Sequence, residues 1–143
     1  MERLKHFRQE YQLEANDELW LMIDVDRWQD KKLSSVTKEA KASGFKLAIS
    51  NPCFETWLLC HYILPTITTS SCKKITEQLG DELKKVHNSA YNKAKLNTDY
   101  FKPYVEQAVQ NAKQLDNNPS TRWPNKVGTH VYKVVAQLVK GSI

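Results

Sequence analysis

The pattern of apolar and polar residues predicts a strand, a helix and then a second strand in the first third of the chain. Leu19–Ile23 is apolar at every position, which is typical of a parallel strand covered on both faces. Lys31–Ser43 carries apolar residues at helical spacing, with lysines between them, and therefore predicts an amphipathic helix. Gly44 suits the C-terminal end of that helix, and Phe45–Ile49 is a second short apolar run.

A second helix is predicted directly after this run. Asn51 offers a capping side chain, Pro52 suits a first helical turn, and Cys53–Tyr62 is apolar and rich in aromatic residues. Strand, helix, strand and helix at these lengths indicate a βαβ unit with a parallel sheet.

The remaining segments predict helices. Near-helical spacing of apolar residues indicates helices over Glu2–Glu14, Ser70–Leu79, Asp99–Leu115 and Thr129–Val139, and no further strand is evident. We therefore expect an α/β fold in one domain over residues 1–143. Its βαβ part would cover residues 1–65 and its helical part residues 66–143.

Composition and charge narrow the class of protein. A chain of 143 residues can bury a core without cross-links. The sequence has neither a long apolar run nor the apolar core of a signal peptide, so we expect a cytoplasmic protein that does not enter a membrane. The three cysteines, Cys53, Cys60 and Cys72, show no framework spacing and are predicted to be free thiols. A net charge of +5 suits a DNA or RNA partner, and equally a merely soluble surface.

Acidic residues follow the first predicted strand. Asp24 and Asp26 are two positions apart, so in an extended chain their carboxylates face the same side. The carboxyl ends of parallel strands meet at one edge, where ligands bind, and the second strand leads there to Asn51 and Glu55. Close carboxylates repel unless a cation lies between them, and Mg²⁺ prefers oxygen ligands. The pattern predicts a Mg²⁺ or Mn²⁺ site on Asp24 and Asp26, with Glu55 nearby.

The same residues also have structural interpretations. Asp24 and Asp26 can be turn and capping residues, and Arg27 can form a salt bridge with them or hold a phosphate. Glu55 falls in a first helical turn, where the helix dipole favours a carboxylate. Asn51 suits a helix cap better than a catalytic amide.

Other combinations of reactive residues are weaker. A mixed set of cysteines and histidines matches no structural zinc spacing: Cys53, Cys60, His61, Cys72 and His87. His61 lies on an apolar helical stripe, which favours a histidine at the edge of the core over one that transfers protons in the acidic crevice. No phosphate-binding loop of the P-loop type is present, so the chain is not itself such an ATPase.

Basic and aromatic residues alternate in two later segments. Residues 84–95 include Tyr91 and Lys93, and Arg122 and Trp123 follow further on. Such mixtures suit contacts with a nucleic-acid backbone and stacking on its bases. A solvated surface is the alternative.

A resemblance to a known family rests on these motifs. Asp24-Val25-Asp26-Arg27, followed by S-N-P-C-F-E-T-W-L-L-C-H at residues 50–61, resembles the RloB-like family, a branch of the Toprim-type domains. The Tyr-Asn-Lys at 91–93 and the Trp-Pro and Gly-Thr pairs at 123–124 and 128–129 are also similar to that family.

The resemblance implies a metal-dependent activity on nucleic acids. Toprim-type domains bind magnesium through acidic residues at strand ends and cut or join phosphodiesters. By this resemblance Asp24 and Asp26 match the metal ligands, and Glu55 with Asn51 matches the signature at the next strand end. Arg27, Asn51 and Lys93 are then the expected substrate contacts. Members occur in prokaryotic anti-phage and restriction-associated loci, often beside an ABC- or AAA-type ATPase.

The chain departs from the family at its N-terminus. The family has an earlier strand that ends in a glutamate, whereas Met1 falls within what resembles the following helix. We therefore expect an N-terminally incomplete Toprim-like sheet. The first hypothesis is a nuclease subunit that acts on DNA or RNA, tRNA included. The second is an inactive adaptor that binds an ATPase or nucleic acid. The sequence leaves the oligomeric state open, a homo-oligomer included.

Overall fold

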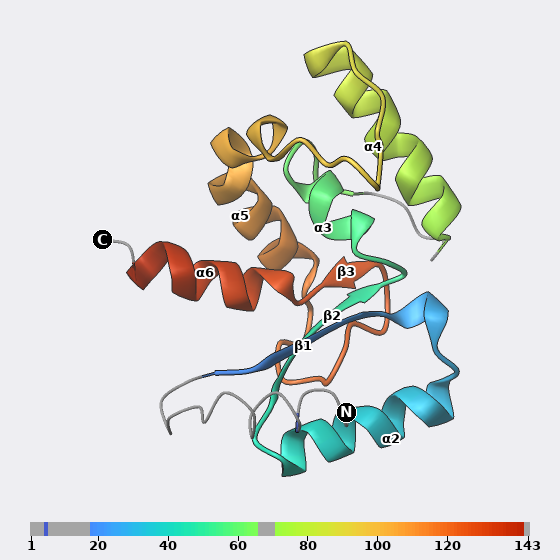
Figure 1. Cartoon of the computed structure of the whole chain (residues 1–143), viewed down its shortest axis with the longest axis vertical. Coiled ribbons are helices and arrows are strands. Elements are labelled where there is room, and N and C mark those ends of the chain that lie inside the picture. Colours follow the sequence, from blue (N-terminus) through green and yellow to red (C-terminus); the bar gives the residue numbers. More distant parts are fainter. Residues whose placement is uncertain (1–4, 6–17, 66–70, 142–143) are drawn as a thin grey trace.

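The computed structural model describes residues 5, 18–65 and 71–141 and shows an α/β arrangement (Figure 1). Strand β1 (Trp20–Asp24), helix α2 (Asp30–Ala42) and strand β2 (Lys46–Asn51) form the predicted βαβ unit. The two strands pair in parallel, with Trp20 opposite Lys46 and Asp24 opposite Ser50. Gly44 ends the helix region with a φ of 79°, a conformation that glycine adopts without strain.

A third strand was missed by the sequence analysis. Strand β3 (Gly128–Thr129) pairs antiparallel with β2, so the sheet order is β1-β2-β3 and the sheet is mixed. The prediction of a purely helical second half was therefore wrong. The hydroxyl groups of Thr129 and Ser50 are 2.7 Å apart, and the His130 N–H donates to the Ile49 carbonyl at 2.9 Å.

Side chains on the two faces of β2 pack into two separate clusters of apolar residues. Leu47 and Ile49 pack toward α2, while Ala48 belongs to the cluster formed with the later helices. Figure 1 shows α2 on one side of the sheet and α5 and α6 on the other. The prediction that the first strand is covered on both faces was wrong for Met22, which is 49% exposed. Among the described residues, β1 has a neighbouring strand on one side only.

Four helices follow the βαβ unit among the described residues: α3 (Glu55–Cys60), α4 (Cys72–His87), α5 (Val105–Leu115) and α6 (Val131–Gly141). Helix α4 is longer than predicted, and two short 3-10 turns, Thr98–Tyr100 and Lys102–Tyr104, replace the predicted start of α5. Helix α3 packs against both α4 and α5, and this packing buries its apolar side chains.

The cysteine prediction was wrong for two of the three residues. Cys53 and Cys72 form a disulfide, whereas Cys60 is free and buried. The two paired residues are 19 positions apart, but the packing of α3 on α4 brings their Cα atoms to 5.7 Å. Sequence spacing alone could not reveal this tertiary contact.

Two further expectations concern the ends of the chain and the membrane. The predicted helix Glu2–Glu14 lies outside the described residues except for Lys5, whose ammonium group is 2.7 Å from Glu39. Within the described residues, no helix has the length and apolarity that a bilayer crossing requires.

Candidate acidic site

The carboxyl ends of β1 and β2 are joined by hydrogen bonds that bring the acidic residues together. Asp24 is the last residue of β1, and the 3-10 turn Val25–Arg27 carries Asp26. The Phe54 N–H donates to Asp24 Oδ1 at 3.0 Å, and the Asp26 N–H donates to the Pro52 carbonyl at 3.0 Å. These bonds hold Glu55, the first residue of α3, at the same edge of the sheet.

The carboxylate of Asp24 interacts electrostatically with both other acids. Burial raises its pKa, the hydrogen bond from Phe54 opposes that rise, and the negative charges of Glu55 and Asp26 raise the pKa further. Asp26 is exposed, while the side chain of Asp24 is only 15% exposed. The structure therefore gathers Asp24, Asp26 and Glu55 into one acidic site that faces solvent on the side of Asp26.

Glu55 is the most buried member of the site. Its side chain is 3% exposed, and its Oε1 atom lies 3.1 Å from the Tyr91 hydroxyl, which donates to it, and 3.5 Å from the Lys93 ammonium group. Its Oε2 atom has no hydrogen-bond partner among the described residues. A buried carboxylate oxygen without a donor is costly, so this atom is available to a ligand. The sequence analysis named Tyr91 as a base-stacking residue and as part of a motif similar to the family, and it missed the contact of Tyr91 with Glu55.

The three residues expected to contact substrate have different surroundings. Arg27 Nε is 3.8 Å from Asp24 Oδ2, and the Arg27 side chain is 68% exposed. Lys93 is 62% exposed and reaches the site from the loop after α4. Asn51 is buried, and its side-chain amide donates to the Pro124 carbonyl at 2.9 Å. The prediction that Asn51 caps the next helix was wrong, because α3 begins at Glu55 and Phe54 occupies the cap position.

A basic cleft adjoins the acidic site. It has a volume of about 650 Å³ and is lined by the turn after β1 and the first turns of α2: Arg27, Trp28, Gln29, Lys31, Lys32 and Ser35. Arg27 contributes to both the cleft and the acidic site. One cation of the cleft, Arg27, therefore lies beside a carboxylate of the site, and an anionic chain in the cleft would pass close to both.

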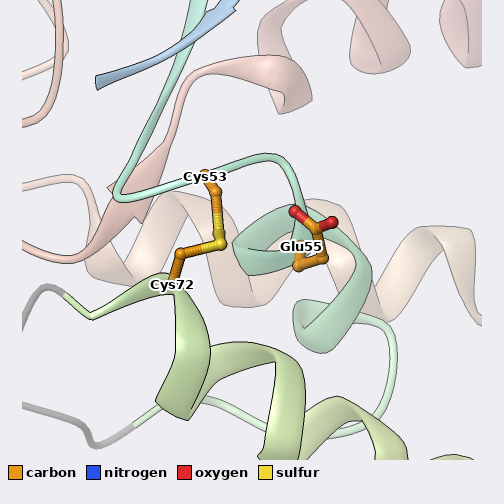
Figure 2. A group of neighbouring side chains, drawn as sticks. All are labelled: Cys53, Glu55 and Cys72. Carbon is orange, nitrogen blue, oxygen red and sulfur yellow. A yellow bond between two sulfur atoms is a disulfide. The ribbon is translucent and has the colours of Figure 1, made fainter. Parts of the chain in front are cut away.

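The disulfide lies next to Glu55. Figure 2 shows the bridge between the loop before α3 and the first turn of α4, with Glu55 beside it. Both sulfur atoms and a Glu55 carboxylate oxygen lie within 4.8 Å of one another. Because the sulfurs are bonded to each other, they are not metal ligands in this structure. The bridge instead links α4 to the loop that positions Glu55.

The other members of the suggested zinc set lie elsewhere. Cys60 is buried, and burial raises the pKa of its thiol to about 12. The Nδ1 atom of His61 is 3.0 Å from the Trp57 carbonyl, and its ring packs edge-on against Phe101. Burial lowers the pKa of His61. The residue is 3% exposed, so it is a hydrogen-bonded histidine as predicted, but it lies within the core and not at its edge. His87 stacks on the ring of Tyr100.

The donor atoms of the acidic site fit a hard divalent cation. They are carboxylate oxygens, and one of them is buried and unpartnered. Burial is the main cause of the raised pKa of Asp24, and the charges of Glu55 and Asp26 add to it. Mg²⁺ and Mn²⁺ prefer such oxygen donors. The residues present therefore fit the metal that the resemblance implies.

Comparisons with known proteins support the resemblance. The family model described as RloB-like protein matches residues 1–138. No curated protein and no solved structure matches the chain. Because the match covers nearly the whole sequence, the chain belongs to the RloB-like protein family.

Proposed function

We propose that this chain is a divalent-metal-dependent nuclease subunit of a prokaryotic anti-phage or restriction-associated defence system, with a Toprim-type site. The observation that carries the proposal is the unpartnered, buried Oε2 atom of Glu55 beside two further carboxylates at the carboxyl ends of parallel strands. This is the edge of an α/β sheet where ligands bind.

Asp24 and Asp26 would hold Mg²⁺ or Mn²⁺, with Glu55 as the third acidic group. When bound, such an ion polarises a phosphoryl oxygen and lowers the pKa of a water molecule. Asp24 is fixed for this role by the Phe54 N–H, which binds one oxygen of its carboxylate. Tyr91 fixes Glu55 in the same way through its hydroxyl group.

The basic cleft would bind the nucleic acid. Arg27, Lys31 and Lys32 can pair with backbone phosphates, and Trp28 offers an aromatic face to a base. Lys93 lies 3.5 Å from Glu55 and is mostly exposed, so it would exchange this carboxylate for a substrate phosphate. The substrate is DNA or RNA, tRNA included, and an ABC- or AAA-type ATPase would be the partner.

A second candidate function is an inactive adaptor for an ATPase or nucleic acid. The observation that favours it is the ion pair of Lys93 with Glu55, which already offsets the charge of this buried carboxylate. This alternative predicts no dependence on divalent metal. It also predicts salt-sensitive binding if nucleic acid is the partner.

The test uses the Asp26→Ala variant, because Asp26 is exposed and its loss should leave the fold intact. Single-stranded DNA, duplex DNA and tRNA are incubated with the chain in Mg²⁺ or Mn²⁺, with and without its ATPase partner. We expect cleavage by the wild type, and no cleavage by the variant or in EDTA. Asp81→Ala, which removes an exposed acid from α4, is the matched control. Cleavage at the wild-type rate by Asp26→Ala would contradict the proposal.

A further inference from the structure

A second cavity lies at the opposite end of the sheet. It has a volume of about 350 Å³ and is lined by residues from β1, α2, β2, the loop before β3 and α6, among them Trp20, Lys41, Lys46, Arg122, His130 and Lys133. Trp20 and Lys46 are the first residues of β1 and β2, whereas the acidic site follows the last residues of both strands. At about 3.3 Å per residue, the five-residue β1 separates the two ends by roughly 13 Å.

Positive charge is concentrated in this cavity. Lys46 is paired with Glu18 at 2.7 Å, but Lys41, Arg122 and Lys133 have no carboxylate within ion-pair distance among the described residues. One guanidinium nitrogen of Arg122 donates to the carbonyl and hydroxyl of Ser34 and to Thr37, which fixes the side chain at the cavity wall.

The arrangement places like charges near one another. Burial lowers the pKa of Lys133, and the nearby charge of Lys41 lowers it further, while Asp116 acts in the opposite direction. The single Asp116 carboxylate faces three cations, Lys41, Arg122 and Lys133, and so offsets only part of their charge. The cavity therefore retains an excess of positive charge.

A buried histidine gives an independent indication of a ligand. His130 lines the cavity and is 1% exposed. Its Nε2 atom lies 3.4 Å from Asp116 Oδ2 but has no hydrogen-bond partner among the described residues. Buried side-chain nitrogens are seldom left without a partner. An anion in the cavity would provide an acceptor for this nitrogen and a counter-charge for the cations.

We infer that this cavity binds a phosphate group, held by the cations Lys41, Arg122 and Lys133 and by the buried ring nitrogen of His130. Arginine and lysine are the usual partners of phosphate oxygens. The cavity volume falls in the range of small-molecule sites and suits a ligand as large as a mononucleotide. The phosphate belongs either to a free nucleotide or to a nucleic-acid backbone. This site is distinct from the acidic site and does not depend on the proposed nuclease activity.

The experiment measures binding calorimetrically to the full chain in EDTA, so that no divalent metal occupies the acidic site. The probes are pyrophosphate, adenosine monophosphate and a short single-stranded oligothymidylate. The double variant Lys41→Gln/Lys133→Gln removes two cations of the cavity. The control, Lys38→Gln/Lys73→Gln, removes two exposed lysines outside it and lowers the net charge equally.

We expect saturable binding that is weakened about tenfold or more in the cavity variant and is little changed in the control, because charge-assisted contacts are lost only in the former. The His130 ring nitrogen resonances should also shift on addition of the bound probe. Binding of pyrophosphate or the mononucleotide identifies a free phosphorylated ligand. Binding of the oligothymidylate alone, with the same dependence on the variants, identifies a backbone phosphate. Absence of saturable binding for all probes, or equal weakening in both double variants, would overturn the inference.

Discussion

Loss of the bond between Cys53 and Cys72 should lower the stability of the fold by a measurable amount. The two residues are 19 positions apart, so the bond closes a loop of about 20 residues around α3. In the loop-entropy model, opening such a loop costs about 3 kcal/mol of unfolding free energy. For a domain of this size, that corresponds to a decrease of roughly 10 °C in the melting temperature.

The assay is urea and thermal unfolding of oxidised wild type, reduced wild type and Cys72→Ser. Cys72 is only half-buried, so serine there should add little cost of its own. Reduced wild type and the variant should both be less stable than oxidised wild type, and reductant should not change the variant. Thiol titration of the denatured, oxidised wild type should detect one thiol, that of Cys60. Three thiols would show that the bond is absent, and equal stability of oxidised and reduced wild type would show that it does not stabilise the fold.

Three further predictions concern single side chains. Because the folded pKa of Asp24 is raised, the wild type should lose stability as pH rises above the ordinary pKa of 3.8. Asp24→Asn keeps an acceptor for the Phe54 N–H but carries no charge, so in urea titrations its stability relative to wild type should increase from acid to neutral pH. Tyr91→Phe removes the hydroxyl donor to buried Glu55 and should lower the unfolding free energy by about 1.5–3 kcal/mol, since hydrogen bonds to charged groups have this strength; an unchanged urea midpoint would argue against the contact. Burial lowers the folded pKa of His61, so below its ordinary pKa of 6.5 the unfolded chain binds more protons than the folded one. The free energy of unfolding should therefore decrease as pH falls below 6.5, and this decrease should be smaller in His61→Leu.

The βαβ unit could be predicted from the sequence because its hydrophobic pattern is local. Uninterrupted apolar runs and a helical stripe of apolar residues placed β1, α2 and β2 within one or two residues of their observed bounds. The strand β3 carries no such signal, because it has two residues and exists only through its pairing with Ser50 and Asn51. The exposed Met22 shows the same limit, since an apolar run does not reveal which face of a strand its neighbours cover.

The acidic site could be predicted only in part. The positions of Asp24, Asp26 and Glu55 at one edge followed from the parallel order of the strands. The hydrogen bond of Tyr91 to Glu55 joins residues 36 positions apart, and the Cys53–Cys72 bridge depends on the packing of α3 against α4. Such contacts arise from tertiary packing, which hydrophobic periodicity does not encode.

The two ends of the sheet have opposite chemistry. Carboxylates gather where β1 and β2 end, whereas the cavity with the lysines and Arg122 opens at the first residues of these strands, with His130 lining it from beside Ile49. The proposed metal site and the inferred phosphate site would therefore lie at opposite ends of the sheet.

Metal binding at the acidic site is tested most directly by a calorimetric titration of the wild-type chain with Mg²⁺ and Mn²⁺. We expect saturable binding that is lost in Asp26→Asn and retained in the matched control Asp81→Asn, which removes an equal charge from the exposed surface of α4. Absence of metal binding by the wild type, or equal affinity in Asp26→Asn, would contradict the assignment of the acidic site.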